Sequence, residues 1–330
     1  MKKSYIIGVD VSKLKLDMHC YGQLQSLVVS NDNKGFKKFL KWIKKEVSKD
    51  KASVMIVMEY SGIYSSRLED FLYEQGISYV KRPALDIKRS VGMKRGKTDR
   101  ADARMISQYG WYRREELKPM KPVSEAQQQL QQLTTYRDKM VADNASYKTR
   151  VKELKDQLGI KLPASIIESS EQIGKVLKEE IKKTEIAIED LLNNNSELQC
   201  NYRLITSIRG ISFVIGVHLL IVTENFTRFT DPRKFACYAG VAPFEHTSGS
   251  SIRGKTKVSQ LANKKIKSLL TLSAICAVRY DPELKAKYEQ KLKEGKPKMS
   301  VLNMIRFKLI ERIFAVIKRQ TPYVLSQAAA

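Results

Sequence analysis

Apolar and polar residues along the N-terminal third of the chain follow the pattern of an α/β sheet. An apolar run at residues 5–9 leads into Asp10, and the segments "KLDMHCYG" and "LQSLVVSN" follow at distances typical of hairpins. These three segments predict consecutive strands in an antiparallel meander. The spacing of Phe36, Phe39 and Ile43 among lysines then predicts an amphipathic helix.

The same region continues with a second strand-and-helix pattern. The segment "SVMIVME" is apolar throughout, as expected of a strand buried on both faces, and it ends at Glu59. A helix over residues 65–74 and a short strand, "ISYVKR", come next. Three strands followed by helix, strand, helix and strand is the order of a ribonuclease-H-like α/β sheet.

The middle of the chain predicts long helices. Pro119 and Pro122 interrupt the chain. Residues 124–158 then contain neither proline nor glycine, which predicts one long helix. A second helix over residues 166–192 pairs with it either within one chain or between chains, and the pattern leaves both open. Heptad spacing typical of a coiled coil is carried by Leu133, Met140, Tyr147 and Leu154 in one seam, and by Leu130, Val151 and Leu158 in a second seam that also holds Arg137 and Asn144.

The last third of the chain is mainly helical in pattern. The segment "ITSIRGISFVIGVHLL" partly matches the helix-hairpin-helix units that grip phosphates through backbone N–H groups, with Ser212 in place of the usual second glycine. Residues 211–222 are too short to span a bilayer and predict a buried core helix. After a stretch rich in glycine and serine, helices are expected over residues 260–279 and 299–319. We expect an α/β plus α architecture with domains at residues 1–115, 116–198 and 199–325.

Charge changes this picture by suggesting a partner. The 330 residues include 60 lysines and arginines against 35 acidic residues, a net charge of +25, while 42% of the residues are hydrophobic. A folded protein with such a field attracts polyanions, so nucleic acid is the leading partner and an acidic membrane surface the second. Asp10 interrupts any secretory signal, which predicts a cytoplasmic, DNA-associated protein without a membrane segment. Four scattered cysteines support neither a disulfide framework nor a zinc site.

Four carboxylates are the candidates for chemistry. Asp10 and Glu59 end apolar strands, and Asp99 and Asp102 lie one helical turn apart in "RGKTDRADARM". Singly, each is more typical of a turn, a cap or a solvated face. If they converge, their mutual repulsion calls for a divalent cation, Mg²⁺ or Mn²⁺ as its substitute, of the kind that supports phosphodiester displacement.

The same segment is also strongly basic. Its cations either contact a nucleic-acid backbone or neutralise the nearby acids in surface ion pairs, and the local sequence favours neither. These candidate nucleic-acid contacts are Lys94, Arg95, Lys97, Arg100 and Arg104.

Four motifs in this order resemble one protein family over nearly the whole chain. They are "GVDVSK" around Asp10, "MEYSGIY" around Glu59, "KTDRADARM" around Asp99 and Asp102, and "AGVAPFEHTSGSSIRG" near the C-terminus. Together they resemble the DEDD-type insertion-sequence transposases, relatives of the pilin-gene invertase. Tyr60 departs from the simplest form of the second motif, where a small residue is expected.

The resemblance implies a fold and a mechanism. It implies a RuvC-like N-terminal domain whose four acids form a metal-binding tetrad, and a C-terminal transposase domain whose nucleophilic serine is Ser248. That serine is expected to form a transient phosphoserine link to DNA. An element-encoded bridge RNA is expected to pair with donor and target DNA. The resemblance also implies a homo-oligomer, a dimer or a tetramer on DNA, in which one subunit's tetrad meets another's serine.

The residues around Ser248 allow more than one interpretation. A Ser-Gly-Ser-Ser run is most often a flexible loop, but a phosphoryl-transfer serine needs such a backbone and nearby cations. Ser250 and Ser251 are alternatives to Ser248, and His246 has no assigned role. The cations that follow are Arg253, Lys255 and Lys257.

Two other functions compete with a recombinase. One is a junction-resolvase-like nuclease that uses the same tetrad and hydrolyses DNA with water. The other is a basic nucleic-acid-packaging protein in which the acids are structural. The tetrad and the serine motif make the packaging protein the least favoured of the three, and covalent protein–DNA adducts distinguish the recombinase from the nuclease.

Overall fold

A computed structural model of the chain describes residues 4–91, 98–153, 162–248, 252–258 and 262–324. Of residues 91, 244–248 and 252–257 it describes the backbone only. The chain divides into two compact units, Met1–Pro122 and Val123–Ala330. Within the described ranges, no helix has the length and apolar character needed to cross a membrane.

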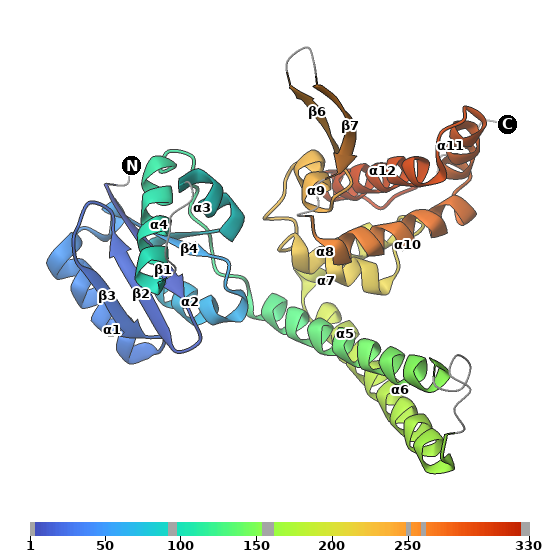
Figure 1. Cartoon of the computed structure of the whole chain (residues 1–330), viewed down its shortest axis with the longest axis horizontal. Helices are drawn as coiled ribbons and strands as arrows, with labels where there is room; N and C mark the ends of the chain where they lie inside the picture. Colours follow the sequence, from blue (N-terminus) through green and yellow to red (C-terminus); the bar gives the residue numbers. More distant parts are fainter. Residues whose placement is uncertain (1–3, 92–97, 154–161, 249–251, 259–261, 325–330) are drawn as a thin grey trace. The chain divides into compact units, whose positions relative to one another are not determined.

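The N-terminal unit is built on a five-stranded mixed sheet (Figure 1). The strands lie in the order β3-β2-β1-β4-β5, with β2 antiparallel to β1 and β3, β4 parallel to β1, and β5 parallel to β4. This order and these directions match the ribonuclease-H-like sheet that the sequence predicts, including its antiparallel meander. The elements are β1 (Tyr5–Val11), β2 (Lys15–Cys20), β3 (Ser26–Ser30), α1 (Asn33–Trp42), β4 (Val54–Glu59), α2 (Ser66–Glu74), β5 (Ser78–Arg82), α3 (Ala84–Val91) and α4 (Asp99–Tyr112).

Both faces of this sheet are covered by helices, because alternate residues of its central strands point to opposite sides. On one face, Ile7 and Val9 of β1 share a core with Phe36 of α1 and Leu68 of α2. On the other face, apolar residues of β1, β4 and β5 pack with those of α3 and α4, as Figure 1 shows for α4. The unit therefore has three layers.

Two glycines let α4 lie directly on the sheet. A Cβ atom added at Gly8 would stand 2.2 Å from Ser107 N, and one added at Gly110 would stand 2.7 Å from Ile6 Cγ2 and 2.6 Å from Val57 Cγ2. Gly110 thus lies over the start of β1 and Ser107 over its middle. Since helix and strand run in opposite directions, the first turn of α4 lies beside the C-terminal end of β1.

The C-terminal unit is helical apart from one β-hairpin. Helices α7 to α10 and α12 surround a common core that includes Ile205, Leu220, Phe235, Leu270 and Ile310. The hairpin β6–β7 projects from the end where α9 lies (Figure 1). The elements are α5 (Glu125–Lys152), α6 (Ala164–Asn193), α7 (Ser196–Thr206), α8 (Phe213–Val222), α9 (Pro232–Tyr238), β6 (Pro243–Ser248), β7 (Ile252–Val258), α10 (Lys264–Tyr280), α11 (Pro282–Lys293) and α12 (Lys298–Arg319).

The two long helices α5 and α6 pack against each other within one chain. The heptad seam is only partly buried: Met140 is covered, whereas Tyr147 is 42% exposed. Arg137, a charged residue in the second seam, forms an ion pair of 2.7 Å with Glu185 of α6. Its charge is therefore balanced where the two helices pack. Leu154 and Leu158 lie outside the described residues. Pairing between chains stays a prediction.

Several C-terminal boundaries differ from the sequence prediction. Helix α10 begins at Lys264 instead of residue 260, because the Asn263 side chain caps it by accepting a hydrogen bond of 3.0 Å from Ile266 N. The Gly- and Ser-rich stretch forms a strand hairpin, and neither it nor α9 and α11 was predicted. The core helix expected over residues 211–222 is confirmed as α8, where His218 is buried with its apolar neighbours.

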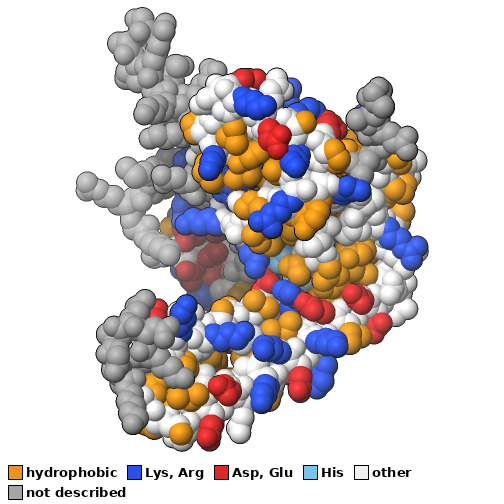
Figure 2. All heavy atoms as spheres, turned by 90° about the vertical axis from the view of Figure 1, so that its right-hand side faces the viewer, with side chains coloured by type: hydrophobic (Ala, Val, Ile, Leu, Met, Phe, Trp, Pro, Cys, Tyr) orange, Lys and Arg blue, Asp and Glu red, His pale blue; other side chains and the backbone are white. Residues whose placement is uncertain are grey.

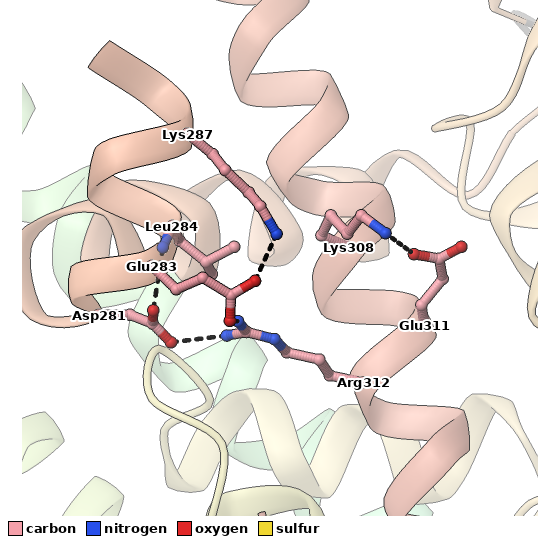
Figure 3. A network of polar contacts seen from close by, with 7 residues as sticks. All are labelled: Asp281, Glu283, Leu284, Lys287, Lys308, Glu311 and Arg312. Atoms are coloured by element: carbon pink, nitrogen blue, oxygen red, sulfur yellow. Dashed lines mark hydrogen bonds and ion pairs between the residues drawn. The ribbon is translucent and has the colours of Figure 1, made fainter. Parts of the chain in front are cut away.

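An ion-pair network that is buried at Asp281 and exposed at Glu283 and Lys287 joins α11 to α12 (Figure 3). The Arg312 guanidinium donates to Asp281 Oδ2 and to Glu283 Oε2, both at 2.6 Å, and Asp281 also caps α11 by accepting from Leu284 N at 3.0 Å. Lys287 adds an ion pair to Glu283. Removing one partner of such a buried pair costs about 3–5 kcal/mol, because the other charge stays buried and unpaired.

Charged side chains of both signs are mixed on one face of the molecule. On the face shown in Figure 2, lysine and arginine side chains lie among acidic and apolar ones instead of forming a single patch.

The close packing of α4 predicts that Gly8→Ala destabilises the N-terminal unit. Its added methyl group has no space, so the free energy of unfolding should fall by about 1–3 kcal/mol. Both tryptophans, Trp42 and Trp111, belong to this unit, so tryptophan fluorescence in a urea titration of the full chain reports on it alone. An unchanged midpoint would contradict the packing of α4 on β1.

Candidate active site

The parallel strands β1 and β4 bring two of the candidate acids to one edge of the sheet. Asp10 lies next to the last residue of β1, and Glu59 is the last residue of β4, in register with Arg82 of β5. Gly8, two residues before Asp10 on the same face of β1, touches α4. Asp10 therefore points to the face that α4 covers.

The first turn of α4 supplies the other two acids. Thr98 caps this helix, its side-chain oxygen accepting a hydrogen bond of 3.2 Å from Ala101 N. Asp99 and Asp102 lie in the first turn, where the helix dipole stabilises negative charge. Their i, i+3 spacing puts both on one side of the helix.

The electrostatics of Asp10 place the other acids near enough for their charges to act on it. The pKa of the Asp10 carboxyl is raised from 3.8 to about 6, first by burial and then by the charges of Asp102, Asp99, Glu59 and Asp17. Strands β1 and β4 and helix α4 thus concentrate negative charge at one place. A free carboxylate here is unfavourable unless a cation balances it.

Asp17 is a fifth acid of this cluster that the sequence analysis did not identify. It lies on β2 directly opposite Asp10 in the antiparallel register, so the two side chains share a face. It is 4% exposed. The sequence shows that "KLDMHC" alternates between two faces of a strand. It does not show which residue of the neighbouring strand lies opposite Asp17, and only that pairing register places Asp17 beside Asp10.

Lys15 forms ion pairs with two acids of this cluster. Its ammonium lies 2.5 Å from Asp99 Oδ2 and 3.3 Å from Asp17 Oδ2. These two carboxylates raise the pKa of Lys15 through hydrogen bonds and charge. Lys15 thus holds Asp99 on the side of the cluster next to β2.

The carboxylates of this cluster are chemically suited to a hard divalent cation. Mg²⁺ and Mn²⁺ prefer carboxylate oxygens, and the acids around Asp10, whose charges add to burial in raising its pKa, are charges that such an ion would balance. As the described side chains stand, no three histidine, cysteine or carboxylate groups are close enough to ligate one ion. Closing the site would draw the carboxylates together against their repulsion, with Lys15 leaving Asp99.

Tyr60 packs beside this edge of the sheet. Its N–H donates to Arg82 O at 3.1 Å, and the Lys81 ammonium lies 5.6 Å from its ring centroid. Lys81 also forms a buried ion pair of 2.8 Å with Glu69. The bulky residue after Glu59 therefore has a packing role.

The candidate nucleic-acid contacts of this region are only partly visible. Lys94, Arg95 and Lys97 lie outside the described residues. Arg100 is exposed on α4, whereas the Arg104 guanidinium donates to Leu24 O at 3.2 Å, after β2. Among these, the structure gives Arg104 a contact within the protein.

Ser248 lies in the other unit. It is the last residue of β6 and pairs with Ile252 of β7, so it lies near the turn of the hairpin. Arg253, Lys255 and Lys257 follow along β7. Their side chains, and those of His246 and Ser248, are outside what the structure describes, as are Ser250 and Ser251 entirely.

Comparison with known proteins identifies the family. A model described as a transposase matches residues 7–159, and a model of the transposase IS116/IS110/IS902 family matches residues 202–289. Pilin gene-inverting proteins of Moraxella lacunata and Moraxella bovis are 26% and 25% identical, over 98% of this chain and 98% of their own lengths. The chain is a DEDD-type transposase of the IS110 family. It is a DNA recombinase, with DNA as its substrate.

Among solved structures, Thermus thermophilus RuvC in complex with a Holliday junction substrate matches 35% of the transposase and 99% of its own chain. The identity is 11% and the TM-score 0.28. The fold of the N-terminal unit is assigned from its strand order and directions alone.

The charge on Asp10 leads to a pH-dependent prediction. Its folded-state pKa lies above 3.8, so the metal-free folded protein loses stability as the pH rises from about 4 through about 6 and Asp10 ionises. Asp10→Asn should therefore raise the melting temperature at pH 8 in EDTA, and this gain should shrink as the pH falls toward 4. Fluorescence-detected melting measures it.

A matched change tests whether the effect belongs to the cluster. Asp86→Asn replaces an exposed carboxylate of α3 in the same unit. It should shift the melting temperature little at either pH. An Asp10→Asn gain that is equal at pH 8 and pH 4.5 would contradict the crowding of charge around Asp10.

Proposed function

We propose that the transposase breaks and rejoins DNA strands with Asp10, Glu59, Asp99 and Asp102 as its metal-binding tetrad. The observation that supports this is that the charges of the other three acids act on Asp10, whose pKa is raised to about 6 by burial together with those charges. When bound, Mg²⁺ would offset the carboxylate charge and stabilise the developing charge on a scissile phosphate. Asp17, opposite Asp10, adds to the negative charge that the ion would balance.

Ser248 is the proposed nucleophile for strand exchange. Its Oγ would form a bond to a backbone phosphorus as one P–O bond of the phosphodiester breaks, and the departing oxygen would take a proton to become a free hydroxyl end. Attack of a hydroxyl end on the phosphoserine reverses the step and rejoins DNA. The support is the position of Ser248 near the turn of a projecting hairpin whose second strand carries three cations.

The serine assignment is tested by covalent adducts. With Mg²⁺ and labelled donor DNA, the unchanged protein should give a protein–DNA species that survives denaturation, and Ser248→Ala should give none. Ser250→Ala and Ser251→Ala are the matched controls and should retain it. Gel electrophoresis under denaturing conditions separates the products.

Other outcomes of this assay carry meaning too. Loss of the adduct in Ser250→Ala or Ser251→Ala alone would move the nucleophile to that residue. Mg²⁺-dependent cutting without any adduct would favour the alternative, a junction-resolvase-like nuclease that hydrolyses DNA with water. If Asp10→Asn binds DNA and functions as well as the unchanged protein, a packaging protein is favoured.

Guidance by an element-encoded bridge RNA and assembly as a homo-oligomer complete the proposal. The net charge of +25 suits an assembly that holds RNA together with donor and target DNA. The exposed apolar residues of the long helices, including Tyr136, Tyr147 and Val176, suit contact with a second copy.

The guide is tested by sequencing RNA that copurifies with the protein from a host carrying the element. A discrete transcript from the element's flank is expected. Random cellular fragments in proportion to their abundance would contradict guidance by RNA and leave DNA recognition to the protein.

A further inference from the structure

Two buried arginines on α12 differ in how their charges are balanced. Arg312 has a side chain 11% exposed, and its two terminal nitrogens each meet a carboxylate oxygen at 2.6 Å, one from Asp281 and one from Glu283 (Figure 3). Its planar fork is thus filled by two negative groups, as is usual for a buried guanidinium.

Arg306, almost two turns earlier on the same helix, has no such partner. It is 4% exposed, and among the described side chains its guanidinium donates one hydrogen bond, from Nη1 to Asn303 Oδ1 at 3.1 Å. Its Nε is buried without a hydrogen-bond partner, and it forms no ion pair with any carboxylate that the structure describes. Burial lowers the pKa of this guanidinium. An uncompensated buried charge of this kind is costly.

The position of Arg306 connects it to the serine hairpin. Asn303, which accepts from Arg306, donates through Nδ2 to Val241 O at 2.7 Å. Strand β6 begins two residues later, at Pro243. One amide side chain therefore ties the guanidinium to the base of the hairpin, where the hairpin leaves the helical body. Asn303 is half-buried.

We propose that Arg306, positioned by Asn303, is an anion site at the base of the β6–β7 hairpin and takes a phosphate group of bound nucleic acid. The unpaired Nε and a terminal nitrogen offer a planar pair of N–H donors to two phosphate oxygens, whereas Arg312 uses its two terminal nitrogens for its carboxylates. The proposal needs only that the protein acts on DNA. It depends neither on the tetrad nor on Ser248.

The first experiment compares Arg306→Met with Arg312→Met by calorimetry at constant ionic strength, in chloride and in inorganic phosphate. Unfolding of the C-terminal unit is identified in the calorimetric trace as the transition without a matching change in tryptophan fluorescence, because both tryptophans lie in the N-terminal unit. In chloride, Arg306→Met should melt at or above the temperature of the unchanged protein, because a buried unpaired charge is removed. Arg312→Met should melt well below it. Phosphate should raise the melting temperature of the unchanged protein saturably and leave Arg306→Met unmoved.

The second experiment separates nucleic acid from free phosphate. Binding of a DNA duplex is measured over a range of salt concentrations, and Arg306→Met should reduce the slope of log K against log salt by about one. Arg306→Lys keeps the charge and loses the fork, so it should retain the slope and bind more weakly. A phosphate-dependent shift with an unchanged DNA slope would make this a small-anion site and overturn the nucleic-acid assignment.

A structural role for Arg306 predicts a different pattern. If Glu245 of β6 neutralises Arg306, then Arg306→Met and Glu245→Gln should both lower the melting temperature in every buffer. The double variant should then lose less than the sum of the two. That result would overturn the proposal.

Discussion

The close contact between the α4 backbone and Gly8 of β1 is the constraint on which the active-site arrangement depends. A side chain at Gly8 would collide with backbone atoms of Ala103 and Ser107, so only glycine lets the helix approach this near. Two residues farther along the strand is Asp10, and about one turn earlier on the helix is Asp102. The distance between those carboxylates is thus set by packing in the core, with no direct attraction between the acids.

That packing concentrates negative charge in a protein that is otherwise strongly positive. Five carboxylates from β1, β2, β4 and α4 act on one another where Asp10 is half-buried, and the ammonium of Lys15 offsets part of their charge at Asp99. A tethered ammonium balances one charge, whereas a divalent ion balances two and accepts several oxygens at once. The free protein is therefore held short of the arrangement that the proposed chemistry needs.

Much of the N-terminal unit was predictable because its signals are local. Apolar runs gave the strands, their order gave the sheet, and the acids at strand ends and in the first helical turn gave four members of the cluster. Asp17 was missed because only the pairing register of β2 places it opposite Asp10. In the C-terminal unit, glycine and serine concealed strands β6 and β7. Arg306 carries no signal in the sequence, since an arginine on an amphipathic helix is ordinarily exposed.

The central claim is that the four acids of the tetrad bind one metal centre. The direct test is anomalous diffraction from crystals of the full chain soaked in Mn²⁺. The account predicts an anomalous peak in contact with the carboxylates of Asp10, Glu59, Asp99 and Asp102, with the Lys15 ammonium displaced from Asp99. Manganese bound only elsewhere, with Lys15 still paired to Asp99, would contradict it.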